Sequence, residues 1–213
     1  MRSSSPAGRR LPAVSLLLSL PALVLAFAPR WAGHLELDWR AVAGGEVWRL
    51  VTGHWTHASA EQLVWDLGAF VVLAAACELR DGPNGRRRLL AAVGLASLAV
   101  PLTLRLALPA VERYRGLSAI DSALFVLLAV LFLREELAAG RAEGWWGGLA
   151  LAAFLGKLGW EAATGATLFA PAAGGAVPLP LAHLAGGLCG LVAACRWEPS
   201  EGLPYRVTST AER

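Results

Sequence analysis

Two separate segments of the sequence place reactive side chains at the ends of apolar runs. In RGLSAIDSALF, Ser118, Asp121 and Ser122 are spaced so that one face of a helix would carry all three. In AHLAGGLCGL, His183 stands among small residues. A serine hydroxyl becomes a nucleophile when a neighbouring base takes its proton, and histidine is the usual base. We therefore expect Ser118 and His183 to be a nucleophile and its general base.

The composition predicts a membrane protein. The 213 residues are 56% hydrophobic and 16% charged, whereas a soluble domain carries about 25% charged residues. Long apolar runs alternate with short polar loops, and the arginines cluster at the ends of these runs. We expect a lipid bilayer and no nucleic acid among the partners. The three cysteines lack metal-site spacing, so neither a metal nor another cofactor is expected.

Six apolar segments are candidates for membrane-spanning helices. We predict an all-α, six-transmembrane-helix bundle with helices at residues 11–28, 60–79, 89–106, 118–133, 145–162 and 179–197. The chain 1–213 is predicted to be one domain, and residues 198–213 a disordered cytoplasmic tail. The first segment could instead be a signal peptide. The proline that directly follows its AFA sequence disfavours cleavage there, and we favour an uncleaved helix.

The arginines predict an orientation for these helices. With the N-terminus inside, roughly two arginines face the cytoplasm for each one outside, which favours N- and C-termini in the cytoplasm of a bacterial inner membrane. Polar residues of four helices then lie at one depth, in a pocket open to the periplasmic or extracellular side. These residues are His54, His57, Gln62, Asp66, Ser118, Asp121, Lys157, Glu161 and His183.

Taken in chain order, EVWRLVTGHWTHAS, GLSAIDSALF and AHLAGGLCGL resemble the marks of the rhomboid intramembrane serine proteases. Those marks are a WR-containing first outer loop, histidines before the second helix, GxSG at the fourth helix, and a histidine followed by small residues in the sixth. The resemblance covers residues 46–194. It implies a rhomboid-like six-helix bundle with a dyad of Ser118 and His183 and no third triad member. The implied substrate is a single-pass membrane protein, cut at or near the outer side of its transmembrane segment.

The pairing of LGKLGWE with AHLAGG resembles one branch of this family, the rhombosortases. That resemblance implies a substrate whose C-terminal sorting tail contains a Gly-Gly-type motif, an apolar helix and a basic end. It leaves open whether water or another nucleophile resolves the acyl-enzyme, and the sequence indicates no oligomeric state.

The sequence departs from the family pattern where an oxyanion would bind. GLSA replaces GxSG, so Ala119 supplies a backbone N–H where the family has glycine. In the second helix, Gln62 and Asp66 occupy the positions of a histidine and an asparagine. Gln62 can donate a hydrogen bond through its amide, but an ionised Asp66 would repel an oxyanion. His57 or His54 is the alternative donor.

Lys157 is the only lysine in the sequence, and we expect it to lie within the fifth helix. Its expected partners are Asp66, Asp121 and Glu161, which would form a charge network around the nucleophile or only fix the helix register. Two variants of the active site also stay open. Lys157 could serve as the base of a Ser–Lys dyad, or Asp121 could orient His183.

Two further classes of function compete with the protease. A catalytically inactive rhomboid-like protein would bind membrane partners, and the changes at Ala119 and Asp66 keep it open. Ser118 and His183 are both retained, which favours the enzyme. A small proton-coupled transporter is the third class, but transporters usually show repeated halves and interrupted helices, and the sequence shows neither.

Overall fold

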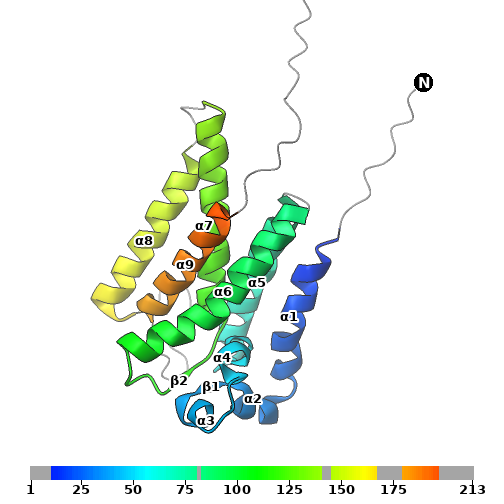
Figure 1. Ribbon diagram of the computed structural model, residues 1–213, viewed down its shortest axis with the longest axis vertical. Helices are drawn as coiled ribbons and strands as arrows, with labels where there is room; N and C mark the ends of the chain where they lie inside the picture. Colours follow the sequence, from blue (N-terminus) through cyan, green and yellow to red (C-terminus); the bar gives the residue numbers. More distant parts are fainter. Residues whose placement is uncertain (1–10, 81–82, 141–144, 167–178, 197–213) are drawn as a thin grey trace, which may run out of the picture.

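The computed structural model describes residues 11–80, 83–140, 145–166 and 179–196, and these residues are mostly helical (Figure 1). The longer helices are α1 (Ala13–Ala26), α5 (Ala60–Arg80), α6 (Pro83–Ala107), α7 (Ser118–Ala138), α8 (Trp146–Thr164) and α9 (Pro180–Cys195). Each overlaps one of the six apolar segments that the sequence singles out. The expected tail, 198–213, lies outside the described residues.

The apolar helices support the membrane class. Within the described ranges, α5 and α6 are each long and apolar enough to cross a bilayer. Helix α1 and the short α2 (Pro29–Leu35) together make a third candidate, bent by 114° between them. Helix α9 is apolar but shorter. The all-helical membrane class therefore agrees with the sequence, while a count of six spans and the side of the termini stay predictions.

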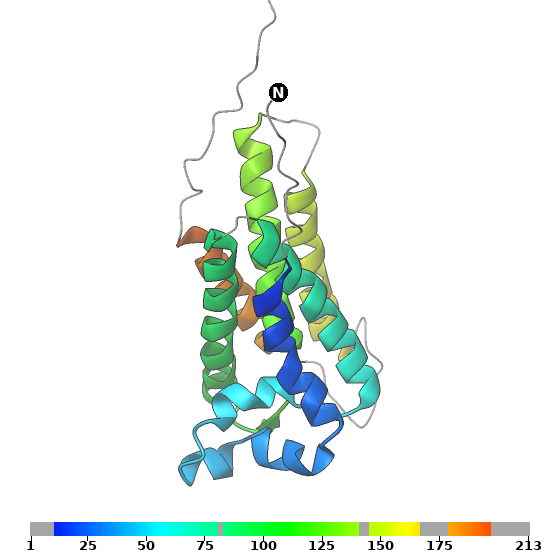
Figure 2. The ribbon, with the colours of Figure 1, turned by 90° about the vertical axis from the view of Figure 1, so that its right-hand side faces the viewer.

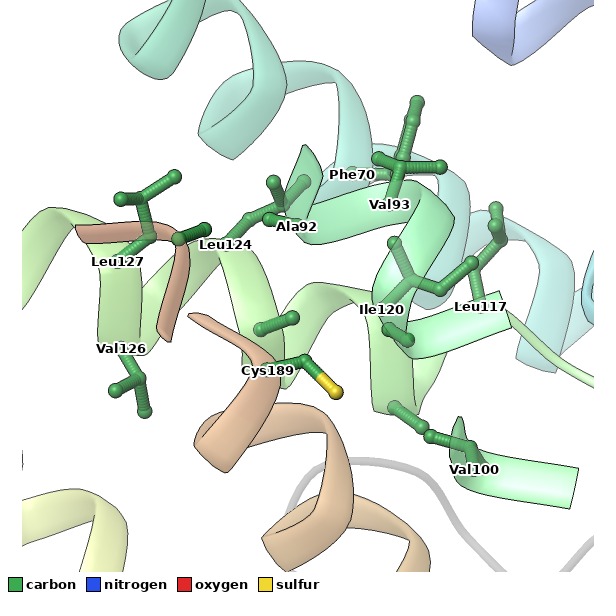
Figure 3. Close-up of a cluster of buried hydrophobic side chains, with 14 of the residues drawn as sticks. Phe70, Ala92, Val93, Val100, Leu117, Ile120, Leu124, Val126, Leu127 and Cys189 are labelled. Carbon is green, nitrogen blue, oxygen red and sulfur yellow. The ribbon is translucent and has the colours of Figure 1, made fainter. Parts of the chain in front are cut away.

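Helix α7 lies at the centre of the bundle. It packs against α5, α6, α8 and α9, whereas α1 packs against α5 (Figures 1 and 2). Figure 3 shows Ile120, Leu124 and Leu127 of α7 in one buried cluster with Phe70 of α5 and Cys189 of α9. Nearly all residues of α7 between Ala119 and Leu131 are buried, because the neighbouring helices cover this part of the helix on most sides.

Glycines bring α9 unusually close to α7. A Cβ added at Gly186 would stand 2.0 Å from the carbonyl oxygen of Ala119, and one at Gly190 would stand 2.0 Å from that of Ala123. Only residues without a side chain permit this approach, which is the physical role of a GxxxG pattern between membrane helices. The contact sets the height of α9 relative to the first turn of α7.

Small elements gather at one end of the bundle, beside the start of α7 (Figures 1 and 2). They are α2, β1 (Leu37–Asp38), α3 (Trp39–Ala43), α4 (Arg49–Thr52) and the 3-10 helix η1 (Gly53–Trp55). Strand β1 pairs antiparallel with β2 (Arg113–Tyr114), with Leu37 opposite Tyr114. The loop that follows α1 is thus joined to the residues that lead into α7.

Charged side chains fix this loop. Arg49 of the WR pair is buried, donates to the carbonyl oxygens of Gly33 and Glu36 at 2.9 Å, and pairs with Glu46. Arg115 pairs with the carboxylate of Glu36 at 2.9 Å. Because Arg115 lies just before α7, these bonds hold the first turn of α7 against the loop.

At the other end of the bundle, Glu78 of α5 anchors α1. Its carboxylate accepts the backbone N–H groups of Val14 and Ser15 and the Ser15 hydroxyl, the last two at 2.8 Å. Glu78 is 2% exposed and also pairs with Arg86. The first turn of a helix has N–H groups without intrahelical acceptors, so this carboxylate caps α1.

Candidate active site

The two expected catalytic side chains meet where α7 and α9 begin. Ser118 is the first residue of α7, and His183 lies in the first turn of α9. The Ser118 Oγ is 3.2 Å from Nε2 of His183. Ser118 is half-buried and His183 is 9% exposed. The pair therefore has the geometry in which a histidine can take the proton of a serine hydroxyl.

Glu161 of α8 contacts the other nitrogen of the same histidine ring. The Glu161 Oε2 is 3.0 Å from His183 Nδ1, and its Oε1 is 2.7 Å from Nζ of Lys157. Glu161 is 3% exposed. Lys157 Nζ also lies 3.2 Å from His183 Nδ1. Four side chains from three helices thus form one connected group.

This group distinguishes between the expected partners of Lys157 and between the two candidate bases. Its direct ionic partner is Glu161, one helical turn away, whereas Asp66 lies within electrostatic range without a described contact. Lys157 approaches the ring nitrogen that faces away from Ser118. The described contacts therefore favour His183 over Lys157 as the base for the serine.

No described contact joins Asp121 to His183. Glu161 instead contacts Nδ1 of the His183 ring. Asp121 is buried in α7, and its Oδ1 has no hydrogen-bond partner within the described ranges. Ser122 donates its hydroxyl to the carbonyl oxygen of Ser118 at 2.9 Å. The shared helix face of these residues was correctly expected from their spacing, but it does not bring Asp121 to the histidine ring.

Asp66 and Gln62 of α5 lie against the chain just before α7. A Cβ added at Gly116 would stand 2.5 Å from Gln62 Nε2 and 3.0 Å from Asp66 Oδ2, and Gly116 has φ +115°. The Asp66 carboxylate also faces the backbone N–H groups of Leu117 and Ser118. Asp66 therefore lies beside the start of α7, where a negative charge is favourable, and Gly116 is needed both for its backbone angle and for space.

The histidines before α5 lie apart from the nucleophile. His57 Nε2 is 3.6 Å from Asp66 Oδ2, and burial lowers the pKa of His57 to about 4. Its imidazole is therefore neutral near pH 7 and does not balance the charge of Asp66. His54 is fully buried, edge-on to the ring of Tyr114 at 5.3 Å between centroids. No described contact joins either histidine to Ser118, so their expected role as oxyanion donors gains no support.

Tyr114 is a further residue of this site and was not among those expected from the sequence. Its hydroxyl donates to the carbonyl oxygen of Gly116 at 3.2 Å and lies beside the Ser118 hydroxyl and the Ala119 N–H. Burial raises the pKa of Tyr114, so the phenol keeps its proton at neutral pH. The position of Tyr114, four residues before the serine, was a signal in the sequence, but only the β1–β2 pairing turns its ring toward α7.

Two cavities lie near this site but are not lined by Ser118. An apolar cavity of about 270 Å³ lies between α6 and α9, with Leu95, Ala99 and Leu188 among its lining residues. Another, of about 220 Å³, lies between α1, α2 and the start of α5 and is lined by His57. The water-accessible pocket expected at Ser118 therefore stays a prediction.

No protein-family model matches the sequence, and no curated protein matches it at a significant level. The rhomboid resemblance accordingly depends on the residues quoted above. Within the described part of the chain, no group of three or more histidine, cysteine and acidic side chains could hold a metal ion.

Proposed function

We propose that this protein is an intramembrane serine endopeptidase of the rhomboid type that cleaves a membrane-anchored protein. The observation that carries the proposal is the 3.2 Å contact between the Ser118 hydroxyl and Nε2 of His183, made between two helices far apart in the sequence. The half-buried serine stands at the end of the central helix, where an extended segment of a substrate could reach it from the outer side of the bilayer.

The chemistry follows from this pair. The Ser118 Oγ attacks the substrate carbonyl carbon while its proton passes to Nε2 of His183. The C–N bond breaks as His183 gives that proton to the leaving amine, which leaves an acyl ester on Ser118. Water, deprotonated by His183, then hydrolyses the ester, so that a new carboxylate is released and the serine hydroxyl is restored.

The developing oxyanion needs hydrogen-bond donors beside Ser118. The backbone N–H of Ala119 and the hydroxyl of Tyr114 lie beside the serine, and the Tyr114 hydroxyl would turn from its present acceptor, the Gly116 carbonyl, to the oxyanion. The Gln62 amide lies beside Gly116 on the side of Asp66, to which it donates at 3.4 Å. We assign the oxyanion to the side of Ala119 and Tyr114. Asp66 faces the N–H groups of Leu117 and Ser118, where an ionised carboxylate would repel a second negative charge.

The membrane topology and the substrate class in this proposal come from the sequence. Six helices cross a bacterial inner membrane with both termini in the cytoplasm, and Ser118 lies toward the outer side. The substrate is a single-pass membrane protein, and its processed segment is a C-terminal Gly-Gly-type sorting tail. The helices at all six apolar segments support this arrangement.

An inactive protein that binds membrane partners is the second candidate, and one observation favours it. Asp66 and Tyr114 already lie beside the N–H groups at the start of α7, which are the groups that would otherwise receive an oxyanion. Such a protein would keep the contact between Ser118 and His183 without an activated serine.

Labelling with a fluorophosphonate, followed by peptide mass spectrometry on the detergent-solubilised protein, tests the proposal. We expect an adduct on Ser118 that is lost in Ser118→Ala and in His183→Ala. Ser122→Ala is the matched control, because Ser122 lies on the same helix face and bonds only to a backbone carbonyl in the described contacts. A folded wild type that forms no adduct on Ser118, or an adduct that survives His183→Ala, would reject the dyad.

A further inference from the structure

The ring of His183 is held on both sides by side chains from different helices. Nε2 faces the Ser118 hydroxyl of α7, and Nδ1 faces the Glu161 carboxylate of α8. A dyad needs only the first of these contacts. In the second contact, the Glu161 carboxylate lies 3.0 Å from Nδ1, which faces away from Ser118. The Glu161 side chain is only 2% exposed.

The position of Glu161 determines which nitrogen of His183 carries the proton. A carboxylate accepts hydrogen bonds and donates none, so Glu161 favours the tautomer with a proton on Nδ1. Nε2 then has a free lone pair that faces Ser118, which is the form a general base requires. In the other tautomer, Nε2–H would face the serine and could not accept its proton.

Lys157 would favour the other tautomer if Glu161 were absent. Its ammonium is 3.2 Å from Nδ1 and can only donate, so on its own it would select a bare Nδ1 and a protonated Nε2. The shorter contact of Lys157, 2.7 Å, is to Glu161 Oε1. This bond occupies one carboxylate oxygen and turns the other toward the histidine.

We propose that Glu161 is a positioning residue that completes a triad with Ser118 and His183, and that Lys157 holds its carboxylate in place. This inference rests on the proposed function, because it assigns a role to Glu161 in the same reaction. It goes beyond the rhomboid resemblance, which implies a dyad. Glu161 touches neither the substrate nor the reacting carbonyl, and it acts only through His183.

The main experiment measures the rate of fluorophosphonate labelling of Ser118 in Glu161→Gln, Glu161→Asp and Lys157→Met. Glu161→Gln keeps the shape and removes the charge, and we expect labelling to be about 100-fold slower. Glu161→Asp keeps the carboxylate and should recover part of the rate. Glu61→Gln is the matched control, because Glu61 is an exposed residue in the first turn of α5. Labelling of Glu161→Gln at the wild-type rate would overturn the triad.

The pH dependence of labelling separates positioning from simple structural support. The charged groups that face the ring are Glu161 and Lys157 of α8, and Asp66 of α5 lies within range of Lys157. Glu161→Gln and Lys157→Met remove charges of opposite sign beside the same ring, so the two variants should change the pH profile of labelling in opposite directions. A slower rate with an unchanged profile in both variants would contradict the inference.

Nuclear magnetic resonance of ¹⁵N-histidine-labelled protein tests the tautomer without any reaction, with His183→Ala used to assign the signal. We expect a proton on Nδ1 in the wild type and on Nε2 in Glu161→Gln. If Ser118 is never labelled but the tautomer changes in this way, the protease proposal fails and the positioning role stands. If Ser118 is labelled but the wild type carries its proton on Nε2, the protease stands and the triad fails.

Discussion

Gly186 of α9 lies directly against the carbonyl oxygen of Ala119 in α7, so close that a Cβ on Gly186 would stand 2.0 Å from that oxygen. His183 is less than one helical turn before Gly186, and Ser118 directly precedes Ala119. The contact between two backbones therefore sets the distance between the two proposed catalytic side chains. The 3.2 Å contact between the His183 ring and the Ser118 hydroxyl joins two separate helices and depends on this approach.

Gly186→Ala should push α9 away from α7. We expect loss of Ser118 labelling and a free energy of unfolding lower by about 1–3 kcal/mol, because the new methyl group meets backbone that cannot move aside. Thermal unfolding in detergent, followed by tryptophan fluorescence, measures the second effect.

The control for this substitution is Gly159→Ala in α8, where nothing lies within 4 Å of an added Cβ. Alanine is favoured over glycine within a helix by about 0.5–1 kcal/mol, so this variant should be as stable as the wild type or more stable. Equal stability of the Gly186 and Gly159 variants would show that the two helices are not in contact as described.

Glu78→Ala should detach the first turn of α1. The substitution leaves the N–H groups of Val14 and Ser15 without their acceptor in a buried place, and we expect a loss of about 2–4 kcal/mol in the free energy of unfolding. Limited proteolysis at the N-terminus should become faster in the same variant.

Glu135→Ala is the matched control for this prediction. Glu135 also pairs with an arginine, Arg80, but its side chain is 61% exposed. Exposed ion pairs contribute about 0–1 kcal/mol, so this variant should unfold close to the wild type. A Glu78 variant that unfolds at the same temperature as the Glu135 variant would contradict the capping role.

Asp38→Asn should make the stability of the segment between α1 and α5, which contains Asp38, less dependent on pH. The backbone N–H of Ala41, and then the Arg40 N–H and Arg113, lower the pKa of Asp38 below its ordinary value of 3.8, with partial burial acting in the opposite direction. A carboxyl with a lowered pKa stabilises the fold above its unfolded pKa, and this stabilisation is lost as the pH falls through the folded value.

The wild type should therefore be more stable than Asp38→Asn at pH 6, and this difference should shrink toward pH 3. Asparagine still caps the short helix α3, so Asp38→Ala should be about 1 kcal/mol less stable than Asp38→Asn at both pH values. Melting temperatures of the three proteins at pH 6 and pH 3 give the comparison. A difference between wild type and Asp38→Asn that stays constant over this range would count against the ionic contribution.

Tyr114→Phe tests the proposed oxyanion donor. The variant keeps the ring that packs edge-on to His54 and removes only the hydroxyl beside Ser118 and Ala119. Loss of one oxyanion donor typically slows the reaction by about 100-fold or more, so we expect slower labelling of Ser118. The variant also loses the hydrogen bond to the Gly116 carbonyl, so its free energy of unfolding should fall by about 1 kcal/mol. Tyr205→Phe, at the only other tyrosine, is the control. An unchanged labelling rate would remove Tyr114 from the site.

The sequence alone was sufficient to predict an all-helical membrane class and the position of each long helix. The length of an apolar run predicts the length of a helix, and its apolar composition, with arginines at its ends, indicates that the helix lies in a lipid bilayer. The sequence also predicted Ser118 and His183 as a pair, since few side chains can supply a nucleophile and a base, and it included Glu161 among three expected partners of Lys157, because residues four apart in a helix are neighbours.

Only the tertiary structure decided which carboxylate meets the histidine. The sequence led us to expect Asp66, Asp121 and Glu161 near one depth. Periodicity tells which face of its own helix each occupies but not how that helix is rotated against its neighbours. The close approach of Gly186 to Ala119, and the β1–β2 pairing that brings Tyr114 to α7, fix those rotations. They arise from contacts between segments distant in the chain, and a local pattern of residue types carries no information about which of these contacts packs best.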